Sequence, residues 1–318
     1  DWLERSLLGE RQVVFVTGEA GIGKTAVVEA FLERAAGAPF IRIARGTCLE
    51  QYGAGEAYLP VLEALGRLSR EPGGTGLAAL LRRHAPTWLI QMPALVSEND
   101  RHWLRREVIG ATKERMLREM AEAMEALAAE APLILVLEDL HWSDYSTLDL
   151  IASLARRREP ARLMLIGTYR PSEVLLSHHP LNAVKQELLM RRRCHEMRLD
   201  YLQEGAVAEY LTLRFPDAKH PGELARSIHR RTDGNPLFMV NVVEYLASRK
   251  LIGVPDPDPD LRKVLEEVET GVPESLRQMI EMQIDRLPAS EQSLLETASV
   301  AGTEFSALAV AADSAKGK

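Results

Sequence analysis

Residues 13–25 read Val-Val-Phe-Val-Thr-Gly-Glu-Ala-Gly-Ile-Gly-Lys-Thr, and this stretch decides the fold. Its apolar, β-branched beginning predicts a buried strand over Gln12–Thr17, and the pattern after it predicts a helix over Ala26–Ala36. Between them stands the complete string G-x-x-x-x-G-K-[ST], Gly18–Thr25. A strand before and a helix after are the context in which this string forms a phosphate-binding loop, the P-loop, so we expect one here.

The loop residues have separate expected roles. The glycines let the backbone curl so that its N–H groups point at phosphate oxygens. Lys24 would reach the β- and γ-phosphates, and the Thr25 hydroxyl would bind magnesium. We therefore expect ATP or ADP with Mg²⁺ as the ligand. The loop residues predicted to contact it are Gly18, Gly21, Ile22, Gly23, Lys24, Thr25 and Ala26.

A second apolar run, Leu133–Leu137, ends in two acids, Glu138 and Asp139. A buried strand that ends in acids beside a P-loop is the Walker B arrangement, in which one carboxylate holds magnesium and the other activates water. The usual order assigns Glu138 to magnesium and Asp139 to the role of general base. The first position is more often Asp than Glu, so the assignment between the two acids stays open.

A third strand, predicted over Leu163–Thr168, leads into Arg170. An arginine at the carboxyl end of a strand in an open α/β sheet lies at the ligand-binding edge. There Arg170 can stabilise charge on the γ-phosphate and contribute to catalysis together with Lys24. The alternative is an ordinary surface arginine in front of Pro171.

The segment Leu140–Asp144 has two interpretations. In the first, Ser143 or Asp144 caps a helix predicted over Ser146–Arg158, and Trp142 packs at its start. In the second, the segment places His141 near the phosphates.

Together the strands predict an α/β fold with a parallel sheet, because continuous apolar runs suit strands covered by helices on both faces. Apolar residues from Leu104 to Leu127 recur at helical spacing and predict one long helix that ends near Pro132. No strand is expected between Gly53 and Ala131. The predicted strands are Gln12–Thr17, Phe40–Ala44, Leu133–Glu138, Leu163–Thr168 and Cys194–Leu199.

After these strands the pattern is helical, and four segments follow. We expect a nucleotide-binding domain over residues 1–200 and a helical lid over 201–253. Residues 254–271 begin with alternating proline and aspartate, which indicates a linker. Helical periodicity resumes in residues 272–318.

Bulk composition excludes some classes of function. The chain has 318 residues, a formal net charge of −7 and 27% charged residues. This acidic balance argues against a surface built to coat nucleic acid, although it leaves room for a small basic face. The arginine runs 156–158 and 191–193 are interpreted as solvated helix ends, with a finger acting on a neighbour's nucleotide as the alternative for the second.

Cysteine usage and hydropathy bear on the compartment. Cys48 and Cys194 stand alone without metal-ligand spacing, as is typical of reduced, intracellular proteins. No apolar run reaches the length of a membrane span, and there is no signal-peptide pattern. We expect a cytoplasmic protein without membrane contact. Both ends of the sequence are interpreted as cut from a longer chain.

Taken together, five strings resemble the STAND ATPases (signal-transduction ATPases with numerous domains). The match is to the bacterial branch found in large LuxR-type transcription regulators and beside adenylyl-cyclase or kinase domains. The strings occur in the family's order and cover nearly the whole chain. They are Gly18–Thr25, Leu133–Asp144, Ile166–Arg170, Thr232–Phe238 and Val272–Leu287.

The resemblance implies further roles. Arg170 matches the sensor-1 arginine, and Pro236 matches the proline of the GxP motif, which lies against the adenine from the lid. Residues 272–318 resemble the start of the family's winged-helix domain, truncated before the wing. The "VGRE"-like box that usually precedes the P-loop is absent. No NKxD-type motif for guanine is present, so ATP is preferred over GTP.

The function implied is a switch: ADP keeps the modules closed, and ATP opens them to signal to effector and sensor domains that lie outside this sequence. Hydrolysis would be slow, and nucleotide-dependent homo-oligomers are possible. DNA contact through the winged helix is possible but unsupported. The alternative is a turnover AAA-type motor or loader of the origin-binding class acting on DNA. A scaffold that binds nucleotide without hydrolysing it is disfavoured by intact Lys24, Glu138 and Asp139.

Overall fold

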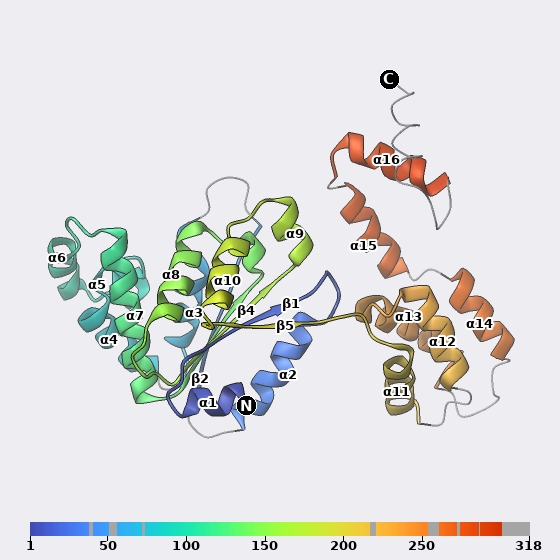
Figure 1. Ribbon diagram of the computed structural model, residues 1–318, viewed down its shortest axis with the longest axis horizontal. Helices are drawn as coiled ribbons and strands as arrows, with labels where there is room; N and C mark the ends of the chain where they lie inside the picture. Colours follow the sequence, from blue (N-terminus) through green and yellow to red (C-terminus); the bar gives the residue numbers. More distant parts are fainter. Residues whose placement is uncertain are drawn as a thin grey trace. The chain divides into compact units, whose positions relative to one another are not determined.

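The computed structural model of the chain describes residues 1–37, 41–50, 56–71, 74–216, 221–253, 261–271, 274–285 and 287–300 (Figure 1). The chain divides into two compact units, Asp1–Asp200 and Tyr201–Lys318. Among the described residues, no helix combines the length and the apolar character that a membrane span requires.

The described part of the first unit holds a five-stranded sheet in the order β2-β3-β4-β1-β5, with all neighbouring strands parallel. Every residue of β1, β3 and β4 is buried, because helices cover both faces of these central strands. The predicted α/β fold is confirmed. The strands are β1 (Gln12–Thr17), β2 (Arg42–Thr47), β3 (Leu133–Glu138), β4 (Leu163–Tyr169) and β5 (His195–Arg198).

Alternate strand residues supply two separate cores. Val14, Val136 and Ile166 face one side, where α1 (Trp2–Leu7) and α2 (Lys24–Ala36) pack. Phe15, Leu135 and Leu165 face the other side. The helices that contribute to this larger core are α3 (Leu59–Leu68), α4 (Leu77–His84), α5 (Pro86–Leu89), α6 (Glu98–Glu107), α7 (Lys113–Glu130), α8 (Tyr145–Arg156), α9 (Pro171–Leu176) and α10 (Leu181–Met190). In Figure 1, α4, α5 and α6 form the left-hand end of this unit.

Two predicted elements were placed wrongly. The second strand was expected over Phe40–Ala44, whereas β2 runs over Arg42–Thr47; Phe40 itself lies outside the described residues. β2 is an edge strand in which only Ala44 and Gly46 are buried, so its arginines concealed the strand in the sequence. The strand expected over Cys194–Leu199 is shorter by one residue at each end.

The single long helix predicted across Leu104–Leu127 is also wrong. The chain forms α6 and α7 instead, separated by a break that contains Gly110, whose φ of 71° is left-handed. Thr112 caps the new helix, because its Oγ1 accepts a hydrogen bond of 3.3 Å from the Arg115 N–H. The apolar spacing continues across the break, so periodicity alone does not reveal it.

Helix α3 packs directly against β2 at Gly46. A Cβ atom at this position would lie 1.7 Å from the carbonyl oxygen of Pro60, in the first turn of α3. The next residue, Thr47, donates its backbone N–H to Glu63 Oε2 of α3 at 2.9 Å. Strand and helix are therefore in backbone contact, and glycine is the residue that permits it.

The described part of the second unit is helical. Apolar residues of its first four helices form a core that includes Val207, Ile228, Val243 and Val268. Residues 254–260 of the predicted linker lie outside the described residues, whereas Leu261–Thr270 form a helix that packs into this core. The winged helix over 272–318 stays a prediction. The helices are α11 (Glu204–Arg214), α12 (Pro221–Thr232), α13 (Pro236–Ser248), α14 (Leu261–Thr270), α15 (Glu274–Asp285) and α16 (Ala289–Val300).

The turn before α13 follows capping rules. Asn235 Oδ1 accepts hydrogen bonds from the N–H groups of Leu237 and Phe238, at 3.0 and 3.4 Å. Gly234 precedes it with a φ of 74°, and Pro236 occupies the first helical position, where a missing N–H costs nothing. Capping alone therefore accounts for Asn235, and the adenine contact expected of Pro236 stays a prediction.

Candidate nucleotide-binding site

The segment Gly18–Thr25 connects the carboxyl end of β1 to α2. Gly21 and Gly23 adopt φ values of 76° and 94°, and Gly18 a φ of 155°, a range that side-chain-bearing residues rarely occupy. The loop therefore curls as the string predicts. Ile22 is 6% exposed and anchors the loop, while Thr25 and Ala26 are exposed in the first turn of α2. An exposed helix N-terminus with free N–H groups attracts anions.

Lys24 is held across the loop. Its ammonium group donates to the carbonyl oxygens of Gly18 at 2.8 Å and Glu19 at 3.0 Å, and the residue is 8% exposed. Burial lowers the pKa of Lys24, and the positive charge of Arg170 lowers it further. A desolvated ammonium group that faces a second cation gains most from an anionic ligand such as phosphate.

The carboxylate of Glu138, the last residue of β3, is bound by Arg45, which no sequence motif had indicated. Arg45 of the neighbouring strand β2 donates from Nε to Oε2 at 2.7 Å and from Nη2 to Oε1 at 3.1 Å. The same guanidinium lies 3.3 Å from Glu29 of α2. Hydrogen bonds to Glu138 raise the pKa of Arg45. A two-pronged contact of this kind fixes the position of the carboxylate.

Asp139 leaves the strand in a left-handed conformation with a φ of 56°. Its backbone N–H donates to Thr168 Oγ1 of β4 at 3.0 Å, which joins the ends of two neighbouring strands. Burial raises the pKa of the Asp139 carboxyl, although the charges of Arg170 and Lys24 oppose the rise. The structure thus brings Asp139, Lys24 and Arg170 into one electrostatic environment.

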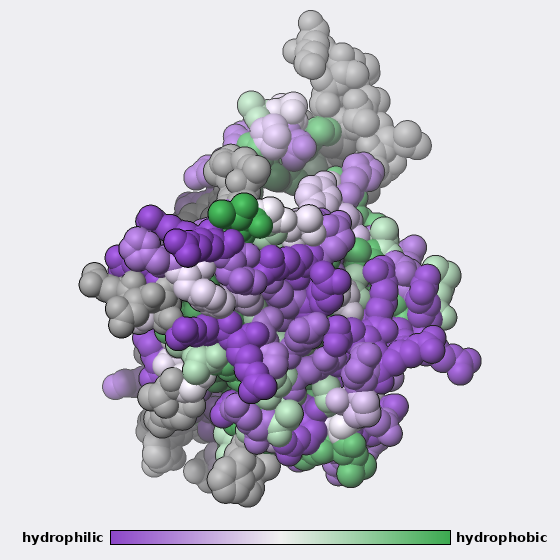
Figure 2. Space-filling view, turned by 90° about the vertical axis from the view of Figure 1, so that its left-hand side faces the viewer, coloured by the Kyte–Doolittle hydropathy of each residue, from purple (hydrophilic) through white to green (hydrophobic). Residues whose placement is uncertain are grey.

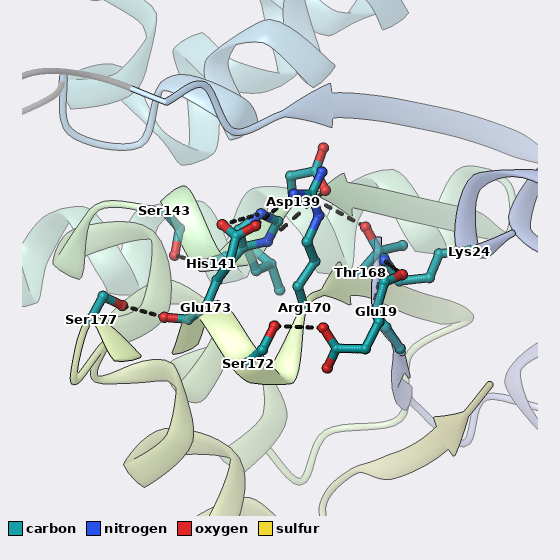
Figure 3. Close-up of polar contacts among 12 residues, drawn as sticks. Glu19, Lys24, Asp139, His141, Ser143, Thr168, Arg170, Ser172, Glu173 and Ser177 are labelled. Atoms are coloured by element: carbon teal, nitrogen blue, oxygen red, sulfur yellow. Dashed lines mark hydrogen bonds and ion pairs between the residues drawn. The ribbon is translucent and has the colours of Figure 1, made fainter. Parts of the chain in front are cut away.

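Arg170 follows β4 at the predicted edge of the sheet. Its Nη1 donates to Glu173 Oε1 at 2.5 Å, and its guanidinium lies 5.5 Å from the centre of the Trp142 ring. Figure 3 shows the Arg170 side chain extending toward Asp139, with Glu173 of α9 beside it. The carboxylate and the aromatic ring hold the guanidinium at the site, so Arg170 is no ordinary surface arginine.

The first interpretation of Leu140–Asp144 is confirmed, and the second, in which His141 lies near the phosphates, stays a prediction. Asp144 caps α8, since its Oδ1 accepts from the Thr147 N–H at 2.9 Å. His141 has a fully buried side chain, with Nε2 at 3.3 Å from Glu173 Oε2 and Nδ1 at 4.0 Å from Asp139 Oδ1. Burial, together with the charge of Arg170, lowers the pKa of His141 to about 3. A neutral imidazole therefore sits between the Walker B acid and α9.

A further contact that the sequence did not suggest links the P-loop to α9. Ser172 Oγ donates to Glu19 Oε2 at 2.5 Å (Figure 3). Helix α9 thus carries two residues that contact the site: Ser172 donates to Glu19 of the P-loop, and Glu173 accepts from Arg170. Only their position in the sequence could have indicated these two residues, because they directly follow Arg170 and Pro171 at the end of β4.

A cavity of about 510 Å³ lies between the β2–α3 connection and the segment that follows the Walker B acids, and no P-loop residue lines it. His141 and Trp142 line it together with the β2–α3 connection. The P-loop, not this cavity, is where the motif places the phosphates.

The parallel sheet, the curled loop with its buried lysine, the acids at the end of β3 and the arginine at the end of β4 define a P-loop NTPase. The AAA ATPase domain family matches residues 1–166. The chain belongs to this family, and the prediction of a STAND-like P-loop ATPase is confirmed. A domain of unknown function matches residues 218–258.

Among curated proteins, an uncharacterized protein of Rhizobium meliloti (strain 1021) is 24% identical over 317 residues, covering 94% of this chain. The chain spans only 28% of the length of that relative.

Several solved structures are also similar. The Walker-type ATPase of Pyrococcus abyssi is 19% identical with a TM-score of 0.41, over 99% of this chain and 87% of that one. A STAND protein with a tetratricopeptide repeat sensor from Pyrococcus horikoshii is 18% identical with a TM-score of 0.41, over 92% and 33%. The Holliday junction branch migration motor RuvB of Thermotoga maritima is 14% identical with a TM-score of 0.42, over 95% and 78%.

Proposed function

We propose that this chain is the nucleotide switch of a longer regulatory protein: it binds ATP or ADP with Mg²⁺, hydrolyses ATP slowly, and reports the γ-phosphate through α9. The observation that carries the proposal is the contact between Arg170 and Glu173, 2.5 Å long. It gives the arginine proposed to face the phosphates a competing carboxylate partner in the first turn of α9, the helix that begins directly after Arg170.

The γ-phosphate competes with Glu173 for the guanidinium of Arg170. When ATP binds, Arg170 exchanges a carboxylate for a more highly charged phosphate, and the first turn of α9 loses the side-chain contact between Glu173 and its N-cap residue Arg170. ADP lacks that group and leaves the contact intact. A ligand shifts a two-state equilibrium only by its differential affinity, and a change from 1:99 to 99:1 requires about 5.5 kcal/mol. The Arg170 contact supplies part of this difference.

The remaining residues have these proposed roles. Gly18, Gly21, Ile22, Gly23, Lys24, Thr25 and Ala26 hold the phosphates, with magnesium bound by Thr25 and Glu138. Asp139 orients and deprotonates the attacking water; the raised pKa of its carboxyl supports this role, since a stronger base accepts a proton more readily. Pro236 contacts the adenine, as the family resemblance implies.

The decisive experiment compares the affinities for ATP and ADP in Glu173→Gln and Arg170→Gln variants by isothermal titration. Glu173→Gln frees Arg170 for the γ-phosphate and should raise the ratio of ATP to ADP affinity, whereas Arg170→Gln should lower it. The matched control is Glu187→Gln, because Glu187 is 34% exposed against 35% for Glu173 and pairs with Arg156 away from the site. Unchanged ratios in both test variants would remove Arg170 as the γ-phosphate sensor.

A second experiment assigns the two acids. Asp139→Asn should keep ATP binding and lose hydrolysis, whereas Glu138→Gln should weaken the dependence of binding on magnesium. Titrations with and without Mg²⁺, beside a phosphate-release assay, separate the two effects. If Glu138→Gln alone stops hydrolysis and leaves magnesium binding unchanged, the two roles are reversed.

The wider role is proposed on the resemblance alone. It includes effector and sensor partners, nucleotide-dependent homo-oligomers, transcription regulation or signal transduction, and a cytoplasmic location. The alternative of a motor or loader acting on DNA makes a different kinetic prediction. Continuous ATP hydrolysis that DNA stimulates would favour it over the switch.

A further inference from the structure

The imidazole of His141 is a polar group held inside the first unit. Hydrophilic residues of this unit gather at its surface, as Figure 2 shows for the face that carries α4–α6. The side chain of His141, by contrast, is fully buried. Within the described part of the chain, neither of its ring nitrogens has a hydrogen-bond partner. Buried polar groups are nearly always hydrogen-bonded, so this imidazole calls for an explanation.

The His141 ring lies between two carboxylates. Its Nε2 is 3.3 Å from Glu173 Oε2, and its Nδ1 is 4.0 Å from Asp139 Oδ1 (Figure 3). Trp142 packs against the ring, with the two ring centres 4.5 Å apart. Burial holds the pKa of His141 at about 3, and a neutral imidazole donates from one nitrogen only. The nearer carboxylate favours the tautomer whose proton is on Nε2, facing Glu173.

Glu173 presents one carboxylate oxygen to each of two donors. Its Oε1 accepts from Arg170 Nη1 at 2.5 Å, and its Oε2 faces His141 Nε2. The contact with Arg170 is shorter and joins two charges, so it sets the orientation of the carboxylate in this structure. If the γ-phosphate takes Arg170, Glu173 loses its cation while its side chain is only 35% exposed. A partly buried carboxylate without a partner is unfavourable, and His141 Nε2 is close enough to become that partner.

We propose that His141 is a positioning residue that receives Glu173 when the γ-phosphate draws Arg170 away. The Nε2–H of His141 then donates to the carboxylate, and only hydrogen bonds are exchanged. The inference rests on the proposed function, because it needs a nucleotide state in which Arg170 leaves Glu173. It adds a second defined position for Glu173, so that the first turn of α9 changes between two arrangements instead of being released.

The test measures the affinities for Mg-ADP and for the magnesium complex of AMP-PNP, a non-hydrolysable ATP analogue, by isothermal titration of the whole chain. His141→Phe keeps a ring against Trp142 and removes the donor. A hydrogen bond to a charged group corresponds to about a tenfold change in affinity or more, so AMP-PNP should bind about tenfold more weakly while ADP binding changes less than about twofold.

The matched control is His195→Phe. His195 lies on the edge strand β5 and stacks on Trp2, with ring centres 5.1 Å apart. The substitution again replaces an imidazole by a phenyl ring beside a tryptophan, and it should leave both affinities unchanged. An equal loss of AMP-PNP affinity in this control would overturn the role assigned to His141.

Two amide variants distinguish the ring nitrogens of His141. The amide nitrogen of glutamine reaches about the place of Nε2, whereas that of asparagine reaches about the place of Nδ1. His141→Gln should therefore bind AMP-PNP like the wild type, and His141→Asn should resemble His141→Phe. Rescue by asparagine alone would contradict the proposal, because His141 would then act on Asp139 and not on Glu173.

A measurement on the wild type does not depend on how the variants fold. In a proton–nitrogen NMR correlation spectrum of the histidine side chains, the Nε2–H signal of His141 is identified by its absence in His141→Gln. This signal should move when Mg-ADP is replaced by the magnesium complex of AMP-PNP, because the hydrogen bond to Glu173 forms only with the analogue. The same position with both nucleotides would overturn the proposal.

The failure of this proposal is distinguishable from the failure of the proposed function. If Glu173→Gln raises the ratio of ATP to ADP affinity and His141→Phe leaves that ratio unchanged, only the role of His141 is lost. If Glu173→Gln and Arg170→Gln both leave the ratio unchanged, Arg170 does not leave Glu173, and both proposals fail together.

Discussion

Replacing Arg45 by methionine separates the stability of the site from its affinity for magnesium. Arg45 makes both of its short contacts to Glu138, the proposed magnesium ligand, and the two side chains are 28% and 10% exposed. Methionine keeps the length of the aliphatic stem and removes the charge. The carboxylate of Glu138 then stays partly buried without its partner, so the folded chain is destabilised. The same carboxylate becomes available to a cation.

The magnitude follows from the contact. Hydrogen bonds that involve a charged group contribute about 1.5–3 kcal/mol, and the partial exposure of Arg45 points to the lower half of that range. A loss of about 1.5–2 kcal/mol lowers the melting temperature of a unit of this size by roughly 3–8 °C. In the wild type, magnesium has to break the Arg45–Glu138 contact before it can bind Glu138. Without that cost, Mg²⁺ should bind about 10–30-fold more tightly. Stability without ligand and affinity for Mg²⁺ therefore change in opposite directions.

Differential scanning fluorimetry without ligand and a magnesium titration in the presence of ATP measure the two effects. Arg42→Met is the matched control, because Arg42 lies on the same strand, is 27% exposed and pairs with Glu130 instead of Glu138. It should leave magnesium affinity unchanged. The reasoning is refuted if Arg45→Met binds magnesium no more tightly than the wild type, since Arg45 and the cation would then not compete for Glu138.

Three further variants test other parts of the site. Lys24→Ala should keep the fold and abolish the thermal shift with Mg-ATP, which in the wild type corresponds to about 2.7 kcal/mol at a hundred times Kd; an undiminished shift would remove Lys24 from the site. For His141 the folded pKa of about 3 lies below the unfolded value of about 6.5, so only the unfolded chain gains a proton between them and stability falls as pH drops through that window. His141→Gln should reduce the loss of unfolding free energy between about pH 7 and pH 5 by about 2 kcal/mol, measured by urea denaturation, and equal losses would contradict burial of a neutral imidazole. Pro236→Ala should abolish the protection by ADP against proteolysis between residues 253 and 261 while magnesium dependence persists; protection equal to the wild type would exclude Pro236 from the base contact.

The parts of the site that were predictable from sequence are those written in consecutive residues. Gly18–Thr25 determines its own loop geometry through glycines, and the Glu138-Asp139 pair follows an apolar run that can only be a buried strand or helix. Asp139 and Arg170 then come close together because parallel strands present their carboxyl ends at one edge.

The residues that escaped prediction meet only through the order of the strands. Arg45 reaches Glu138 because β2 pairs with β3, and no local pattern states that pairing. Glu173 and Ser172 look like an ordinary start of a helix until α9 is placed beside the P-loop. The break at Gly110 was missed for the opposite reason, since the apolar spacing on its two sides happened to agree in phase.

The contact between Gly46 and Pro60 limits how much of β2 can move when magnesium displaces Arg45 from Glu138. Arg45 precedes the position at which β2 and α3 touch through their backbones, and Thr47 after it is tied to Glu63. A side chain can rotate away from Glu138 without cost to this joint, whereas a shift of the β2 backbone would push Gly46 against α3 and carry that helix with it. Magnesium is thus expected to displace Arg45 by a change of rotamer, while the β2 backbone stays in place against α3.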